Sequence, residues 1–498
     1  MAKYVIVRGA LLLDAKTPAA QHADVLIKDD TIAEVGTPGL AAPDEATTID
    51  ARDRLLIPGL VNAHTHSHAN IPRGLGDRWT LELALNANPA IRGSQSAEEK
   101  YLAAQLGAAE MIRKGCTACY DLVYEFPEPS IEGLTATAQG YADAGMRAVV
   151  APLMATQSFY AAIPGLMDVL PDNVQSDFRK QSFSPSERSV DITRRALQDW
   201  RFDRGVVTLG VAPHSPLHSS DEFLVGVHGL AREFDVPLQT HLAESKVQAV
   251  AGIRKYGKTL TAHLADLGIL GPSFTAGHGV WLDQNDMNRL ADAGASVAYN
   301  PASNMRYGNG LAAIRPMLDV GLNVGIGTDS RTCSDNLNMF EAMRLASFTS
   351  RVQTPDFRRW LTTDDALRMA TINSARLLGL PGQFGVIGQG YKADMVFLDL
   401  KNLNYIPLNN AINQVVNAED GTGVDSVMIG GRLILDNGRL TTIDVDRLRS
   451  GAEAAMERLR SVNGKALDLA LRLEEVVGSF CVGLAQSPYH VQRYCGHA

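Results

Sequence analysis

The chain has 498 residues, a net charge of −9 and 45% hydrophobic residues, values that are ordinary for a soluble globular protein. An acidic balance argues against a nucleic-acid surface, and no apolar run approaches the ~20 residues of a membrane span. The amino terminus lacks a signal-peptide pattern, and the five cysteines form no disulfide-rich pattern. We therefore expect a cytoplasmic protein with reduced thiols, with no membrane or nucleic-acid partner.

The first 54 residues predict a β-meander. Apolar or alternating runs at 4–7, 25–28 and 31–35 are separated by polar and glycine breaks. Similar runs return at 394–400 and 426–435, and the second of these predicts a hairpin. Because neither piece has enough apolar surface for a core of its own, we expect the two to form one small discontinuous β-sandwich domain.

Strands and helical patterns alternate between these two pieces, which predicts βα units and a (β/α)8 TIM-like barrel in an α/β protein. A helix over 363–378 would close the barrel. The candidate barrel strands end near His66, Leu122, Met154, His214, His241, His278, Asn304 and Asp329.

Four segments follow from this division. The predicted segments are 1–57 (first part of the β-sandwich), 58–385 (barrel), 386–444 (second part of the β-sandwich) and 445–498 (helical extension). The extension would hold two helices, over 446–462 and 465–477. The Cys116–Cys119 pair resembles a zinc or redox pair, but it has no second pair and lies at a predicted strand, so we interpret both residues as buried thiols.

The run Val61–His66 is the most informative motif. Side chains alternate along a strand, so His64 and His66 point to the same side and could clamp a divalent metal. A lone His-x-His is weak evidence, because such pairs occur on surfaces by chance. Three later strand-like runs also end in single polar groups, at His241, His278 and Asp329. In a barrel the carboxyl ends of the strands share one face, so the series predicts a metal site there.

With these motifs the chain resembles the amidohydrolase superfamily along nearly its whole length. The branch it most resembles contains S-adenosylhomocysteine and methylthioadenosine deaminases, guanine and cytosine deaminases, and triazine hydrolases. The matching segments are 58–66, 73–74, 212–216, 241–244, 278–279, 300–304 and 327–329. Ser330 stands where the family often has Gly, and Asp77-Arg78 stands where a second acidic residue often occurs. We expect both positions to face the substrate.

The resemblance implies a role for each site residue. One divalent metal per chain, zinc or else iron, would be held by His64, His66, His241 and Asp329. Glu244 and His278 would be catalytic, the first as a proton shuttle and the second at the attacking water, and Asp329 would also accept the nucleophile's proton. His214 would contact the substrate. Binuclear relatives need a bridging residue on strand 4, and the run 207–215 has no Lys, Glu or Cys, so we predict one metal.

The predicted function is a metal-dependent aminohydrolase. A metal-activated water would replace an amino group on a carbon of an N-heterocycle, a small-molecule substrate, and the enzyme would be a homo-oligomer. One alternative is hydrolysis of another C–N or C–X bond, such as a substituted amine, halide, amide, urea or carbamate, at the same site. The other is a metal-binding scaffold without catalysis. Apolar and aromatic residues of the long loop after the third strand are candidates for ring stacking, at Phe159, Tyr160, Ile163, Leu166 and Met167.

Overall fold

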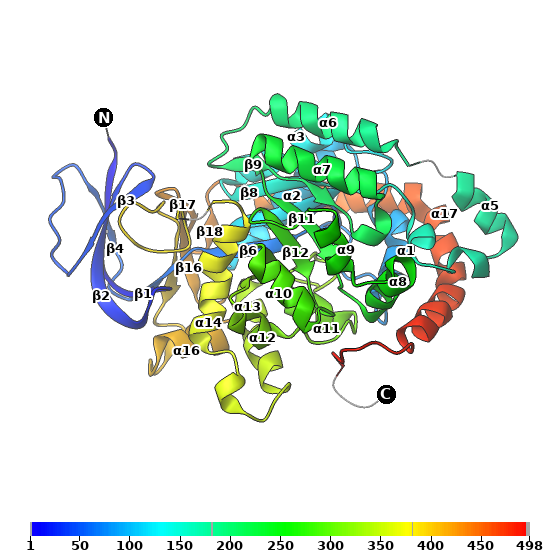
Figure 1. Ribbon diagram of the computed structural model, residues 1–498. Helices are drawn as coiled ribbons and strands as arrows, with labels where there is room; N and C mark the ends of the chain where they lie inside the picture. Colours follow the sequence, from blue (N-terminus) through cyan, green and yellow to red (C-terminus); the bar gives the residue numbers. More distant parts are fainter. Residues whose placement is uncertain (1, 181–182, 381, 495–498) are drawn as a thin grey trace.

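The computed structural model describes residues 2–180, 183–380 and 382–494 (Figure 1). Segments from the two ends of the sequence form one nine-stranded sheet, in the order β18-β17-β16-β15-β5-β1-β2-β3 with β4 on β1. Its strands are β1 (Tyr4–Asp14), β2 (Thr17–Lys28), β3 (Thr31–Gly36), β4 (Thr47–Asp50), β5 (Arg54–Pro58), β15 (Met395–Asp399), β16 (Val424–Ile429), β17 (Arg432–Asp436) and β18 (Arg439–Leu440). The predicted pairing of the two ends of the chain is therefore present.

The joint between the two ends is the antiparallel pair of β5 and β15, in which Leu56 faces Phe397. Alternate residues of these strands point into a separate apolar core that contains Val7, Val25, Leu56, Met395 and Phe397. Each half alone would leave this face exposed to water, which explains why the sheet needs residues some 340 positions apart, as the pairing of Arg54 with Asp399 shows.

Two parallel sheets form the middle of the molecule. The first has the order β10-β8-β7-β6 with β9 on β8, and the second has the order β11-β12-β13-β14. Their strands are β6 (Leu60–Thr65), β7 (Cys116–Tyr124), β8 (Arg147–Met154), β9 (Val207–Leu209), β10 (Ala212–Pro213), β11 (Leu238–Leu242), β12 (Phe274–His278), β13 (Ser296–Tyr299) and β14 (Asn323–Ile326). A parallel bridge between Val211 and Leu238 joins the sheets at one side. At the other side, the Asp329 N–H donates to the carbonyl of His64 over 2.9 Å.

Helices lie outside these sheets, as expected for βα units (Figure 1). They are α1 (Leu81–Arg92), α2 (Ala97–Arg113), α3 (Ile131–Ala144), α4 (Phe159–Ala162), α5 (Asp172–Lys180), α6 (Ser186–Gln198), α7 (Asp221–Phe234), α8 (Lys246–Tyr256), α9 (Leu260–Asp266), α10 (Gln284–Asp292), α11 (Pro301–Arg306), α12 (Ile314–Asp319), α13 (Met339–Arg351), α14 (Thr363–Arg368), α15 (Ser374–Leu377), α16 (Ala411–Asn417) and α17 (Val445–Ala485). A π-helical turn, Met369–Asn373, connects α14 to α15, so the predicted helix over 363–378 is present with a bulge.

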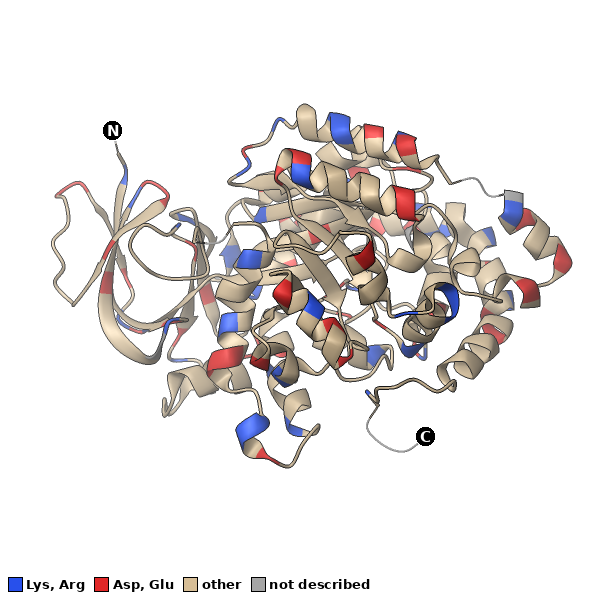
Figure 2. Cartoon of the chain, in the orientation of Figure 1, with Lys and Arg blue, Asp and Glu red and all other residues tan. Residues whose placement is uncertain are grey.

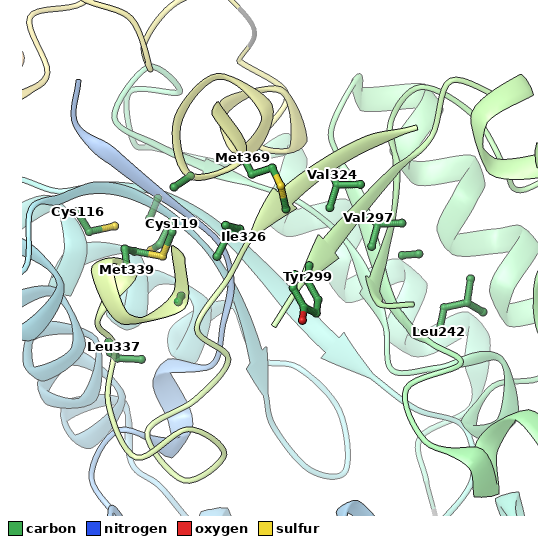
Figure 3. Packing of buried hydrophobic residues seen from close by; sticks show 14 of the residues in the cluster. Cys116, Cys119, Leu242, Val297, Tyr299, Val324, Ile326, Leu337, Met339 and Met369 are labelled. Carbon is green, nitrogen blue, oxygen red and sulfur yellow. The ribbon is translucent and has the colours of Figure 1, made fainter. Parts of the chain in front are cut away.

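Buried apolar side chains fill the space between the parallel strands and the helices. Figure 3 shows Val297 and Val324 of adjacent strands beside Ile326 and Met369. Cys116 and Cys119 lie in the same core near Met339, and both are free thiols, as are Cys333 and Cys481. The interpretation of Cys116 and Cys119 as buried thiols is confirmed, while Cys495 lies outside the described residues.

Two predicted elements differ from the structure. Asn304 does not end a strand; β13 stops at Tyr299, and Asn304 lies in α11, which begins at Pro301. The two predicted C-terminal helices are one helix, α17, which continues through Gly464. Its buried side packs along α1, and the side chain of Asn463 donates to the carbonyl of Gly93 over 3.0 Å. This packing outweighs the roughly 1 kcal/mol that an interior glycine costs a helix.

The surface carries both signs of charge. Figure 2 shows Lys and Arg interspersed with Asp and Glu along helices such as α6 and α7. Among the described residues, no helix is both long and apolar enough to span a bilayer.

Candidate metal-dependent active site

The predicted site residues lie together at the carboxyl ends of the parallel strands. His64 is in β6 and His66 follows that strand directly, while His241 is in β11. His278 is the last residue of β12, and Asp329 follows β14 by three residues. All five side chains are buried. Four strands therefore deliver polar groups to one point, which is the arrangement that their spacing in the sequence predicts.

The distances between these groups suit a single small cation. His66 Nε2 lies 3.3 Å from Asp329 Oδ1, and His64 Nε2 lies 3.8 Å from the same oxygen. His241 Nε2 lies 3.3 Å from His66 Nε2. Ligand atoms bound at ~2.1 Å to a tetrahedral ion lie ~3.4 Å apart, so the observed separations match a shared tetrahedral centre.

The other ring nitrogen of each histidine is bonded to the protein. His66 Nδ1 donates to the carbonyl of Leu122 and His241 Nδ1 to the carbonyl of His214, both over 2.8 Å. His64 Nδ1 pairs with the side-chain oxygen of Gln239. These bonds fix the ring orientation and place the proton on Nδ1, which leaves the Nε2 lone pair for a metal.

The protonation states also fit a divalent metal. Burial lowers the pKa of His64 to about 4, in spite of the nearby Asp329 carboxylate, so the imidazole is neutral. Burial alone would raise the pKa of Asp329, but the surrounding histidines, with His278 and His64 foremost, bring it down to about 2. His64 Nε2 is buried and has no hydrogen-bond partner. Neutral imidazoles and an ionised carboxylate are the forms that bind metal, so the residues present fit a divalent cation.

Glu244 and His278 flank this cluster. His278 Nε2 lies 3.6 Å from Glu244 Oε2 and 3.9 Å from Asp329 Oδ2. His278 Nδ1 donates to the side-chain oxygen of Asn304 over 2.8 Å, and burial lowers the pKa of His278 to about 4. With its proton on Nδ1, the neutral ring of His278 presents a lone pair on Nε2. This nitrogen lies near both the Glu244 and the Asp329 carboxylate, and it can accept a hydrogen bond there.

The backbone is strained at the site. Ala243, His278 and Asp329 have φ angles of 49°, 68° and 60°, in the left-handed region that costs a non-glycine residue of order 1–3 kcal/mol. Each lies at or just after the end of a strand, where the chain turns beside the cluster. Packing and hydrogen bonds hold these conformations; for example, the Trp281 N–H donates to the carbonyl of Ala243 over 2.9 Å.

His214 follows β10 and lines a cavity above the cluster together with residues of β11 and α1. The cavity volume is about 40 Å³, which corresponds to roughly three waters at about 10–15 Å³ each. The lining residues are His66, Leu81, Ala84, Leu85, Asn88, Leu153, His214, His241, Glu244, Gln248, Tyr307, Asp329 and Cys333. The side nearest the candidate ligands is thus polar, whereas α1 contributes a mostly apolar wall.

The residues expected to stack on a substrate ring do not line this cavity. Phe159 and Tyr160 are buried in the main core, where Tyr160 stacks on Phe178 at 4.1 Å and donates to Asn86 over 2.8 Å. Asp77 and Arg78 are exposed and do not line this cavity, so the expectation that they face the substrate stays a prediction. Ser330 is buried beside Asp329, and its hydroxyl contacts Cys333 of the cavity lining over 2.8 Å.

Sequence reasoning assigned no role to several residues that contact the site. Gln239 orients His64, and it could have been found, because it precedes His241 by two and so shares its face of the strand. Asn304 holds His278, and Ser303 donates to Asp329 Oδ2 over 2.6 Å, both from α11. Asn309 donates to Glu244 Oε1 over 3.2 Å from the loop after α11. The last three carry no signal in strand periodicity.

Comparison with known proteins finds relatives that match nearly the whole chain. A 5-methylthioadenosine/S-adenosylhomocysteine deaminase of Syntrophobacter fumaroxidans is 32% identical over 93% of this chain and 98% of its own. A 5'-deoxyadenosine deaminase of Methanobrevibacter smithii is 29% identical over 92% and 99%. Among solved structures, an adenosine deaminase from Xanthomonas campestris with bound zinc has 25% identity and a TM-score of 0.81, covering 92% of this chain and 98% of its own.

An atrazine chlorohydrolase from Arthrobacter aurescens TC1, complexed with zinc, has the same identity and TM-score and covers 91% of this chain and 99% of its own. The sequence matches the description of the amidohydrolase family over residues 55–434, more than half of its length. Together with the ligand geometry at the strand ends, this match establishes that the chain belongs to the amidohydrolase family.

Proposed function

We propose that the protein removes an amino group from a ring carbon of a small N-heterocyclic substrate, with one metal ion per chain. The class of enzyme, a metal-dependent aminohydrolase, agrees with the curated relatives, which are deaminases of adenine nucleosides. The observation that carries the proposal is one buried cluster of three overlapping sets of candidate ligands, which together contain His64, His66, His241, Glu244, His278 and Asp329.

His64, His66, His241 and Asp329 would hold the metal, with zinc as the expected ion. A metal in such a site lowers the pKa of water from 15.7 to ~7, which supplies a nucleophile at neutral pH. Zinc occupies the adenosine deaminase and chlorohydrolase structures with the same fold. One metal is proposed because segment 207–215 brings no Lys, Glu or Cys to the site.

The protein groups would then move the protons. Water adds its oxygen to the ring carbon, and its proton passes to the Glu244 carboxylate, which delivers it to the leaving amino nitrogen. The C–N bond breaks and ammonia leaves, so the ring gains an oxygen and loses an amine. His278 accepts a hydrogen bond from the attacking water through Nε2, and Asp329 Oδ2, 3.9 Å from that nitrogen, can accept a proton in turn.

The alternative function is hydrolysis of another C–N or C–X bond at the same site. The likeness to an atrazine chlorohydrolase favours it, because a halide is a leaving group that needs no proton. The apolar α1 wall, which includes Leu81, Ala84 and Leu85, would suit an uncharged ring as readily as a nucleoside base. His214, which also lines the cavity, would contact either kind of substrate.

The proposal also covers the closure of the barrel and the domain boundaries. We infer that the two parallel sheets close into one (β/α)8 barrel over 58–385, with a β-sandwich formed by 1–57 and 386–444 and an extension over 445–498. The bridge of Val211 to Leu238 and the bond between Asp329 and His64 support closure at the two seams. The homo-oligomer and the cytoplasmic location stay predictions.

Glu244→Gln tests the function. We expect ammonia release from purine, pterin, pyrimidine or triazine amines to fall by roughly 10² to 10⁴ in kcat while the metal stays bound, because the amide keeps the shape but cannot carry the proton. Glu222→Gln, an exposed glutamate on α7, is the matched control and should behave as wild type. Turnover of Glu244→Gln within a few-fold of wild type would contradict the proposed mechanism.

A further inference from the structure

A continuous set of contacts runs from Glu244 to the C-terminal tail, Tyr489–Tyr494, which follows α17. At the active-site end, Asn309 Nδ2 donates to Glu244 Oε1 over 3.2 Å, and the Glu244 N–H donates to the side chain of Gln248 over 3.0 Å. The other oxygen, Oε2, faces His278 at 3.6 Å. Asn309 therefore holds one oxygen of the carboxylate so that the other is directed at the reacting centre.

Asn309 is itself held from behind. It is buried at 2% exposure, and its carbonyl accepts from the indole Nε1 of Trp281 over 2.7 Å. Its own N–H donates to the carbonyl of Asn304, the residue that orients His278, over 2.8 Å. Two residues further on, the Leu311 N–H donates to the carbonyl of Arg493 in the tail over 2.8 Å. The loop that carries Asn309 is thus fixed between the site and the tail.

The tail also fixes Trp281 and the loop around it. The Arg493 guanidinium donates to the carbonyls of Val280 and Leu282, over 2.9 and 2.5 Å, on either side of the indole. Tyr494 packs edge-on against Trp281 with ring centroids 5.1 Å apart. A Cβ at Gly310 would lie 2.9 Å from the Arg493 carbonyl oxygen, so only glycine permits this close approach, and its φ of +110° favours glycine too.

We propose that the C-terminal tail is a positioning element of the active site, in which Arg493 holds the Glu244 carboxylate in place through Trp281 and Asn309. The inference rests on the proposed function, because it assigns Glu244 to proton transfer. A displacement of about 1 Å at a reacting group can cost roughly 10²-fold in rate. Arg493 and Asn309 are positioning residues, so their loss acts on kcat rather than on metal or substrate binding.

The test compares Arg493→Ala, Asn309→Ala and the double variant in the zinc-loaded full-length protein. We expect kcat for ammonia release to fall about 10-fold in Arg493→Ala and 10- to 100-fold in Asn309→Ala, with KM within about threefold and metal content unchanged. In the Asn309→Ala background, Arg493→Ala should cost less than about twofold more, because the two residues act through one contact. Arg493→Lys, which can still donate to one of the carbonyls, should recover part of the kcat.

Arg472→Ala removes an exposed arginine of α17 and is the matched control, with kcat expected as in wild type. Independent, multiplicative losses in the double variant, or equal losses in kcat and metal content, would overturn the proposal. If Arg493→Ala proves too unstable to purify, Arg493→Lys alone and in the Asn309→Ala background decides the same question. Loss of activity in Glu244→Gln with none in Asn309→Ala would contradict the positioning role and leave the proposed function intact. Full activity in Glu244→Gln would contradict the function itself.

Discussion

Two parts of the site are built in opposite ways: the cluster of candidate ligands, and the cover of the cavity, which consists of α1 with α17 and the tail packed beside it. Each candidate ligand is placed at or just after the end of a strand; His64 lies in β6, and His66 directly follows that strand. The cover joins parts that are distant in sequence. Asn86 of α1, for example, donates to the carbonyl of Ala470 in α17 over 2.9 Å, across 384 residues.

The chemistry of the site therefore depends on the strands, and its enclosure depends on packing between helices that are distant in sequence. The cluster follows from strand direction and side-chain alternation, so it should survive changes in the cover. The cover depends on packing between α1, α17 and the tail, which are close together in Figure 1 although they come from opposite ends of the sequence. Changes there should alter rate and selectivity while leaving the metal bound.

The His278→Ala variant should separate metal binding from catalysis within the cluster. If one metal is held by the four proposed ligands, the variant should keep close to one metal per chain and lose roughly 10² to 10³ in kcat, because stabilisation of the transition state is lost. Elemental analysis and ammonia release on the same preparation check this. A halved metal content would indicate a binuclear site, and wild-type activity with the metal intact would contradict both accounts.

Leu85→Ala tests the cover with a smaller expected effect. Leu85 lines the cavity, so its truncation should lower KM for ring substrates with bulky substituents by about 3- to 10-fold, without changing metal content. Leu83→Ala is the control, because Leu83 is also partly buried on α1 but faces Gly478 of α17. Both variants should lose on the order of 1–2 kcal/mol of unfolding free energy. An equal change of KM in both would contradict the assignment of Leu85 to the cavity wall.

The pH dependence of stability tests the burial of His218, which lies next to His214. Burial lowers the pKa of His218 to about 3 from its ordinary 6.5, with His241 and Lys255 adding to the effect. The unfolded chain therefore takes up this proton first, and stability is lost as pH falls from about 6.5 toward 3. The free energy of unfolding, measured in urea, should drop between pH 7.5 and pH 5.0. This drop should be smaller in His218→Gln than in wild type, by on the order of 1–2 kcal/mol. An equal drop in His218→Gln and wild type would contradict the lowered pKa of His218.

The contrast between the cluster and the cover also explains which residues the sequence could predict. Period-two alternation predicted that His64 and His66 lie together, and strand endings predicted that His241, His278 and Asp329 join them, because those signals are local. Asn304 was placed at a strand end instead of in α11, since Pro301 starts a helix directly after β13. Residues that act through packing left no comparable pattern. The stacking role expected of Tyr160 failed because its ring is buried against Phe178, a contact that no local rule predicts.

The most direct test of a one-metal aminohydrolase is a reconstitution titration. The chain is stripped with a chelator, zinc is added stepwise, and ammonia release from a heterocyclic amine is followed together with bound metal. We expect activity to be absent in the stripped protein and to reach its plateau at one equivalent, while His241→Ala regains neither metal nor activity. A plateau that requires two equivalents, or ammonia release by the metal-free chain, would contradict the account.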